Sequence, residues 1–334
     1  MKSLLIPLVF FLFIFTNQSA YSQPTDSDIP TYSGNALTAD TSSSFIIAGD
    51  LQLQSPILEF WRENNRAAVG AICGKIALLH PGFLFVLGDL TFDGASEKLW
   101  RTFDAYAKPI RDSNIRTYPL LGNHEYFTNK RKMFYQYSSR FSHINEQLWY
   151  LIKWHDVAII ALNSNFSKLT KKERRLQDEW YGQVLRLLDR DKSVASIIVA
   201  CHHPPYTNST VVSDDQTVQE HFVLPFKQSP KSVLFITGHC HSYEHFVIDG
   251  KNFIVSGGGG PRQELEESGD SLKQDHYNPS KEDSLTLYKK HSMNCIRPHH
   301  FCKVSRVNGK LILDMEQVSE DLKTWTIGET VTLR

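Results

Sequence analysis

The sequence predicts an α/β fold in which strands and helices alternate along the chain. Short apolar runs rich in β-branched and aromatic residues, typical of buried strands, recur between residues 45 and 256. Between them lie longer segments whose apolar residues recur at helical spacing. Because connections between parallel strands are right-handed, this alternation should place the C-terminal ends of successive strands along one edge of a sheet.

The first half of the chain is predicted to contain three strands, at 45–48, 83–87 and 117–121. A helix from near residue 56 to residue 79 should connect the first two. A second helix, around residues 99–110, should connect the second strand to the third. These elements form a strand–helix–strand–helix–strand unit.

The second half continues the alternation and ends in antiparallel structure. The predicted elements are paired strands at 148–152 and 157–162, a helix at 171–190, a strand at 194–200, a helix at 216–226, a strand at 232–236, and a hairpin of strands at 244–248 and 253–256. Residues 263–300 are polar and are interpreted as an irregular excursion, and residues 301–334 as a C-terminal hairpin that turns at Asn308-Gly309. We therefore expect one domain at 45–334.

The N-terminus has the features of a secretory signal peptide. Lys2 precedes a twelve-residue apolar run at 4–15, which is too short to span a bilayer comfortably, and small residues suggest cleavage after Ser22. We expect a flexible leader at 23–44 and a secreted or periplasmic protein without stable membrane insertion; an uncleaved anchor is the alternative. The balance of 36 basic and 36 acidic residues gives no support for nucleic-acid binding.

The chain has five cysteines, and an exported protein meets an oxidising compartment in which thiols can pair. Cys295 and Cys302 lie close together in a loop-rich region, and we expect them to form a disulfide. Cys201 and Cys240 follow predicted strands and are interpreted as small buried packing residues.

Polar side chains that suit metal ions follow five of the predicted strands. They are, in chain order, Asp50, Asp89, Asn123 with His124, His202, and His239 with His241. Each of them alone is more often a turn or core residue. In open α/β sheets, however, ligands bind outside the carboxyl ends of the strands, so the set predicts a two-metal site with one carboxylate able to bridge both ions.

The motifs that carry these residues resemble those of the calcineurin-like metallophosphoesterase superfamily over residues 45–260. They are Gly49-Asp50, Gly88-Asp89, Gly122-Asn123-His124-Glu125, His202-His203-Pro204-Pro205 and Gly238-His239-Cys240-His241. The segments 242–244 and 256–260 are most similar to the purple acid phosphatase branch. The resemblance implies a four-layer α/β/β/α sandwich of two mixed sheets flanked by helices, with a dinuclear centre at the strand ends.

The resemblance also implies roles for individual residues. Asp50 and His241 would hold the first metal, Asn123, His202 and His239 the second, and Asp89 would bridge two Mn, Fe or Zn ions. A metal-bridging hydroxide would then attack a small phosphorylated substrate, a monoester in preference to a diester, with His124 as the general acid. His203 is a further candidate for substrate binding, and Asp93 is a candidate to orient His124.

Two positions depart from the family pattern. Gln52 stands where much of the superfamily has a ligand histidine, and it offers only a weak amide ligand. The alternative function is therefore a degenerate, single-metal or non-catalytic protein that binds phosphate or metal. Phe92 stands where purple acid phosphatases have the tyrosine that gives their colour, so we expect a colourless protein.

Overall fold

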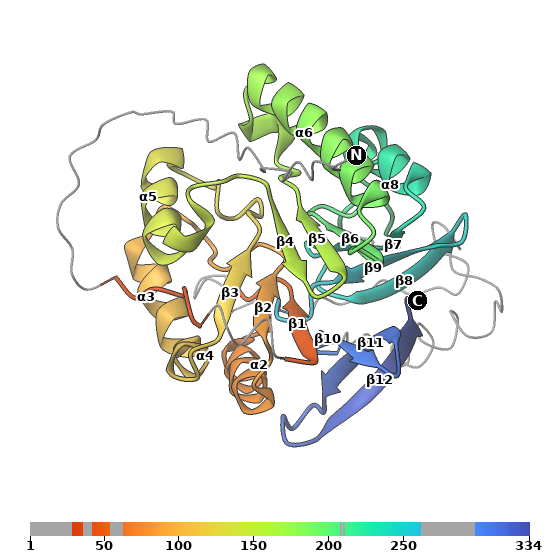
Figure 1. Ribbon diagram of the computed structural model, residues 1–334. Coiled ribbons are helices and arrows are strands. Elements are labelled where there is room, and N and C mark those ends of the chain that lie inside the picture. Colours follow the sequence, from red (N-terminus) through yellow and green to blue (C-terminus); the bar gives the residue numbers. More distant parts are fainter. Residues whose placement is uncertain (1–28, 36–41, 54–62, 208, 210, 262–297) are drawn as a thin grey trace, which may run out of the picture.

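Two six-stranded mixed sheets form the centre of the computed structural model, which describes residues 29–35, 42–53, 63–207, 209, 211–261 and 298–334 (Figure 1). Sheet A has the strand order β12 (Trp325–Thr332), β11 (Lys310–Val318), β10 (His300–Val307), β1 (Ser44–Ala48), β2 (Phe83–Val86) and β3 (Arg116–Pro119). Sheet B has the order β4 (Tyr150–Trp154), β5 (Val157–Ala161), β6 (Ser196–Ala200), β7 (Ser232–Thr237), β9 (Lys251–Ser256) and β8 (Tyr243–Ile248).

The parallel strands lie where the alternating sequence pattern predicts them. In sheet A, β1, β2 and β3 pair in parallel, and in sheet B, β5, β6, β7 and β9 do so. The remaining pairs are antiparallel, including the hairpin of β8 and β9. The predicted strands at 45–48, 83–87, 157–162 and 232–236 are thus confirmed to within about one residue at each end.

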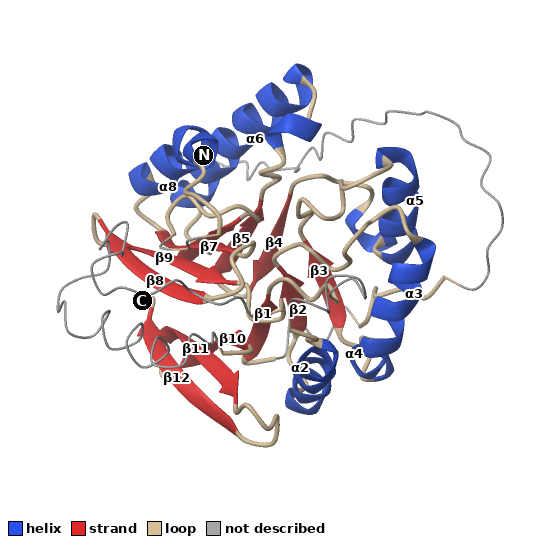
Figure 2. Cartoon of the chain, turned by 180° about the vertical axis from the view of Figure 1, so that it is seen from behind, coloured by secondary structure: helices blue, strands red, loops and turns tan. Residues whose placement is uncertain are grey.

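Helices cover the outer faces of both sheets (Figure 2). Beside sheet A lie α2 (Arg66–Leu79), α3 (Glu97–Tyr106), α4 (Lys108–Asp112) and α5 (Lys130–Arg140). Beside sheet B lie α6 (Lys171–Arg190), α7 (Gln216–Val218) and α8 (Leu224–Gln228), the last two joined by a π-helical turn at Gln219–Val223. Single 3-10 turns occupy Ser142–Ile144 and Phe166–Lys168. This arrangement is the expected four-layer α/β/β/α sandwich.

Sheet B is buried on both faces, which explains why its strands are continuously apolar. In β6, Ile198 belongs to the cluster between the two sheets, whereas Ile197 and Val199 pack against the helices. Helix α6 contributes Tyr181 and Leu185 to that second cluster. Its start is fixed by a capping box, because Thr170 accepts a hydrogen bond from the Glu173 backbone and the Glu173 carboxylate accepts one from Thr170.

Part of the expected flexible leader is packed against the domain, so that expectation is wrong for residues 29–35, which we call the N-terminal strap. The Tyr32 side chain is 2% exposed, contacts the ring of Phe141, and donates a hydrogen bond to Asp104. The amide of Thr117 in β3 donates to the carbonyl of Tyr32, so the strap covers the outer edge of sheet A. A single buried tyrosine in a polar segment gives no periodic signal in the sequence.

The C-terminal region is larger than the predicted hairpin. β10 and β11 turn at Asn308-Gly309 as expected, but β12 adds a third strand and β10 pairs with β1. Cys302 in β10 is a fully buried free thiol, so the expected disulfide with Cys295 is not supported; Cys295 lies outside the described residues. The predicted signal peptide at 1–22 and most of the predicted excursion at 263–300 also lie outside them. No helix in the described part of the chain is both long and apolar enough to cross a membrane.

Candidate metal centre

The polar residues that follow the strands of both sheets lie close together at the C-terminal ends of these strands. Asp50, Asp89 and Asn123 follow β1, β2 and β3 of sheet A, while His202 and His239 follow β6 and β7 of sheet B. Asp50, Asp89 and His239 have positive φ angles of 59°, 51° and 69°, a region that non-glycine residues rarely adopt. Backbone strain of this kind concentrates at functional sites.

Two glycines of the motifs are required because the carboxylates pack directly on the backbone. A Cβ atom on Gly122 would lie 2.1 Å from Oδ1 of Asp89, and one on Gly238 would lie 2.5 Å from Oδ2 of Asp50. Any larger residue would displace a carboxylate. The close approach of a carboxylate therefore explains why glycine precedes Asn123 and His239, separately from any need to form a turn.

Three of the predicted ligands converge on a fourth, His202, which is fully buried. Its Nε2 lies 3.2 Å from Oδ2 of Asp89, 3.0 Å from Oδ1 of Asn123 and 3.2 Å from Nδ1 of His239. Its Nδ1 lies 2.8 Å from the Leu87 carbonyl, which fixes the proton on Nδ1 and turns the Nε2 lone pair toward the other ligands. Metal-binding histidines are commonly oriented by a backbone carbonyl in this way.

A second group gathers around Asp50, which is also fully buried. Both oxygens of Asp50 accept from the backbone amide of His239 at 3.0 Å, and Nε2 of His241 lies 3.7 Å from Oδ1. Nδ1 of His241 lies 2.9 Å from the Pro261 carbonyl, so its Nε2 faces the Asp50 carboxylate, as in His202. The structure therefore brings His241 to Asp50 and His202 to Asp89.

Gln52 closes the side of the centre next to His241. In the orientation that satisfies its hydrogen bonds, its amide nitrogen donates to the carbonyls of Asp50 and Asp89, at 2.9 Å each. The amide oxygen then lies 3.3 Å from Nε2 of His241. The residue predicted to be a weak ligand thus directs an oxygen toward Nε2 of His241.

The charges of the centre explain why it suits cations. Burial raises the pKa of Asp50 well above its usual range, and the nearby Asp89 charge adds to this effect. Burial also acts to raise the pKa of Asp89, but the His202 charge outweighs it and the pKa falls below its ordinary value. The two carboxylates in turn raise the pKa of His202 to about 9 against its own burial. The two buried carboxylates therefore favour positive charge at the position where they meet His202.

The other imidazoles are suited to bind metal as neutral ligands. Burial, followed by the His202 charge, lowers the pKa of His239 to about 3 and that of His203 well below its ordinary value. Donor atoms of Asp50, Asp89 and His202 lie within 4.8 Å of one another, and so do those of His202, His203 and His239. Carboxylate, amide and imidazole donors in this arrangement fit first-row transition-metal ions.

His124 lies beside these ligands and is held by two hydrogen bonds. Its backbone amide donates to Oδ1 of Asp89 at 3.0 Å, and its Nδ1 lies 2.8 Å from the Phe92 carbonyl. That carbonyl takes the orienting role expected for Asp93. The Asp93 carboxylate accepts instead from Thr128 Oγ1, at 2.8 and 2.9 Å, and from the Ala95 amide, so the expectation for Asp93 is wrong.

His203 is held next to the second group of ligands. Its backbone amide donates to Oγ of Ser164 at 3.0 Å, and its Nδ1 lies 2.8 Å from the same oxygen. The ring centroid lies 4.7 Å from that of His239. This position suits either contact with a phosphate or a place among the ligands.

The chain is similar to known proteins in both sequence and fold. Residues 43–243 match the family model described as calcineurin-like phosphoesterase. The chain belongs to this family. The curated proteins include no significant match to it.

Solved structures of family-like fold are similar over nearly the whole chain. The protein described as GAP50, the anchor in the inner membrane complex of Plasmodium, is 16% identical, with a TM-score of 0.66 and coverage of 87% of this chain and 88% of that one. A purple acid phosphatase from yellow lupin seeds is 17% identical with a TM-score of 0.63, and covers 88% of this chain but only 54% of its own. A dimetal phosphatase from Danio rerio is 12% identical with a TM-score of 0.55, covering 87% of this chain and 99% of its own. These likenesses establish the fold.

Glu125, the last residue of the third family motif, supports the centre from behind. Its fully buried carboxylate accepts from the backbone amides of Asp89, Leu90, Thr91 and Gly122, at 2.7 to 3.3 Å. Burial and the Asp89 charge raise its pKa to about 7, against the effect of these donors. The sequence indicates only that Glu125 completes a turn; its position directly after His124 is the one signal of a wider role.

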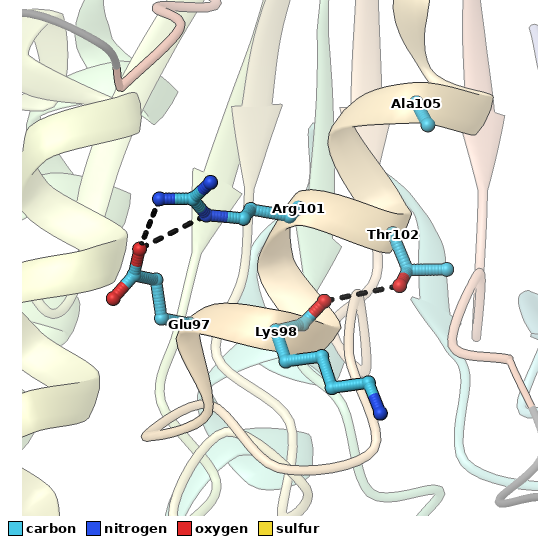
Figure 3. Close-up of a pocket in the computed structure, with 5 residues that line it drawn as sticks. All are labelled: Glu97, Lys98, Arg101, Thr102 and Ala105. Atoms are coloured by element: carbon cyan, nitrogen blue, oxygen red, sulfur yellow. Dashed lines mark hydrogen bonds and ion pairs between the residues drawn. The ribbon is translucent and has the colours of Figure 1, made fainter.

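One surface depression lies away from these residues. It has a volume of about 540 Å³ and runs along α3, lined by Glu97, Lys98, Arg101, Thr102 and Ala105 (Figure 3). Within it, Arg101 is paired with Glu97 of the same helix at 2.6 Å. None of the candidate ligands lines it, so it has no part in the metal centre.

Proposed function

We propose that this family member is an exported, metal-dependent hydrolase of phosphate esters that prefers monoesters to diesters. The observation that carries the proposal is the convergence of buried carboxylates and oriented imidazoles at the strand ends of both sheets. In particular, Nε2 of His202 lies within 3.2 Å of both Asp89 and Asn123. The family match supports the reaction class, and the N-terminal sequence supports export.

The donor set divides into two metal positions. Asp50, His241 and the Gln52 amide oxygen would hold the first ion, and Asn123, His202 and His239 the second, with Asp89 between them. Bound ions would neutralise the phosphate oxygens and lower the pKa of a water molecule, which are the two electrostatic requirements of phosphoryl transfer.

His124 would supply the proton that the departing oxygen needs. Its Nδ1 is engaged by the Phe92 carbonyl, so Nε2 is the nitrogen that can pass a proton to a substrate. His203, which Ser164 holds beside His239, would contact the phosphate group. Glu125 would keep the loop that carries Asp89 in place through its hydrogen bonds to that loop.

A non-catalytic or single-metal binding protein is the second candidate, favoured by Gln52 at the usual histidine position. A protein of similar fold is described as an anchor, so this fold is compatible with a function other than hydrolysis.

Metal content and turnover separate the two candidates. Protein reconstituted with Mn, Fe or Zn should bind two ions and hydrolyse p-nitrophenyl phosphate faster than bis(p-nitrophenyl) phosphate. The Asp89→Asn variant should lose turnover by a factor of at least about 100, because a neutral amide cannot bridge two cations. Binding of one ion or none together with no turnover would refute the hydrolase and support the second candidate.

A further inference from the structure

Three aromatic rings form a cluster at the edge of the candidate metal centre. The centroid of the Phe92 ring lies 4.7 Å from that of His124 and 5.7 Å from that of Phe127. The His124 and Phe127 centroids are 6.0 Å apart and their planes meet at 26°. His124, the proposed proton donor, is therefore flanked by two phenyl rings.

The rings belong to two loops that hydrogen bonds join at several points. The Gly94 amide donates to the His124 carbonyl at 3.2 Å, and His124 Nδ1 bonds to the Phe92 carbonyl. Thr128, which follows Phe127 in the sequence, donates a hydrogen bond to the carboxylate of Asp93, which follows Phe92. The Phe127 amide closes a turn onto the His124 carbonyl at 3.2 Å. The two rings are thus preorganised, so a ligand that contacts them need not order the loops first.

The exposure of Phe127 is not explained by the fold. Its side chain is 59% exposed, whereas Phe45, Phe83 and Phe85 in sheet A are fully buried. Single exposed apolar residues are common, but here Phe92 is also partly exposed and both rings adjoin a proposed catalytic group. Aromatic rings gain additional attraction from stacked or edge-on contact with another ring.

We propose that Phe92 and Phe127 form a leaving-group subsite beside His124, and that the preferred substrates are phosphate esters of aromatic alcohols. The subsite rests on the proposed hydrolase function. In the reaction, the bond from phosphorus to the aryl oxygen breaks with its electron pair on that oxygen. The oxygen receives the proton from Nε2 of His124, and a water oxygen forms the new bond to phosphorus. That water keeps one proton on the phosphate product, and the proton that it loses restores His124 through solvent. The aryl group must therefore lie within reach of the ring that both phenylalanines contact.

Binding of two phosphonates tests the subsite without turnover. Phenylphosphonate and methylphosphonate share the anionic group and differ in the presence of the ring. Calorimetric titration of the full-length, metal-reconstituted protein should show that Phe127→Ala weakens phenylphosphonate binding about fivefold, the loss expected for one aromatic pair, and leaves methylphosphonate unchanged. Phe92→Ala should act in the same direction, and Phe127→Leu should lose less because it keeps apolar area.

Leu187→Ala provides the matched control, since Leu187 is 61% exposed on α6 and is not part of the cluster. It should change neither affinity. If Phe127→Ala and Phe92→Ala lose the same affinity for both phosphonates, or lose none for either, the subsite is overturned. It is also overturned if the wild-type protein binds neither compound. If the wild-type protein binds phenylphosphonate selectively but hydrolyses no ester, the hydrolase proposal fails while the aryl site stands. If the protein hydrolyses esters but the variants show no selective loss of phenylphosphonate affinity, the hydrolase proposal stands and the subsite is rejected.

Discussion

At the scale of single residues, the orientation of His124 determines which esters should depend on it. The Phe92 carbonyl holds Nδ1, so only Nε2 can serve the leaving oxygen. His124→Ala should slow an alkyl ester about 100-fold or more, because an alkoxide needs the proton as the bond breaks. Hydrolysis of p-nitrophenyl phosphate should fall much less, since its leaving group is stable as an anion. Comparison of kcat/KM for the two esters checks this, and equal losses would argue against proton donation by His124.

Gln52 should set the affinity of the first metal position. Its amide nitrogen is held by the carbonyls of Asp50 and Asp89, so its oxygen is fixed toward His241. An amide oxygen is a weaker ligand for transition metals than an imidazole. Gln52→His should therefore tighten binding of one ion, and Gln52→Ala should weaken it, by about tenfold in each case. Metal retained after dialysis against a chelator measures this, with exposed Gln147→Ala as the control. Unchanged retention in Gln52→Ala would exclude Gln52 as a ligand.

At the scale of elements, the sequence predicts best where a buried strand ends in a motif. The run before Asp50, for example, is fully apolar and lies in β1 at the centre of sheet A. The sequence does not predict β12, because most of its residues are exposed and polar and its pairing with β11 depends on tertiary context. The sequence does not predict the contacts of Asp93 for a similar reason. Spacing alone does not reveal that its side chain turns toward Thr128, away from His124.

The N-terminal strap should loosen in acid because His143 joins it to β3. Nε2 of His143 lies 2.9 Å from the Thr117 carbonyl, and Nδ1 lies 3.4 Å from Ser33 Oγ. Burial and the Arg116 charge lower the pKa of His143 to about 4. The unfolded chain binds this proton near pH 6.5 and the folded protein only near pH 4, so stability is lost as the pH falls through this window.

Protonation of His143 should therefore lower the free energy of unfolding by about 1 to 2 kcal/mol between pH 6.5 and pH 4.5. This value is reduced because the imidazole is partly exposed to solvent. Urea titrations at several pH values measure the slope. His143→Gln should flatten it, whereas His155→Gln, at an exposed histidine, should not. The same slope in wild type and His143→Gln would show that other groups control the acid response.

At the scale of the whole molecule, the candidate centre spans both sheets. Sheet A supplies Asp50, Asp89 and Asn123, while sheet B supplies His202, His239 and His241. The order of the motifs predicts that these side chains share a strand-end edge. It does not predict that two separate sheets contribute to it, because the packing of β1–β3 against β5–β7 depends on side chains far apart in the chain. That information came from the family resemblance.

Because the proposed ligands come from both sheets, bound metal ions should stabilise the packing of one sheet against the other. An ion that binds only the folded protein adds about 2.7 kcal/mol when its free concentration is 100 times its Kd. For a chain of this size we expect Tm to fall by about 5 °C or more when a chelator removes the ions. Differential scanning calorimetry with and without chelator measures the shift. In Asp89→Asn the chelator should have little effect on Tm, whatever the stability of that variant, because the shared ligand is gone. A chelator shift of equal size in both proteins would mean that the stabilising ions bind elsewhere on the molecule.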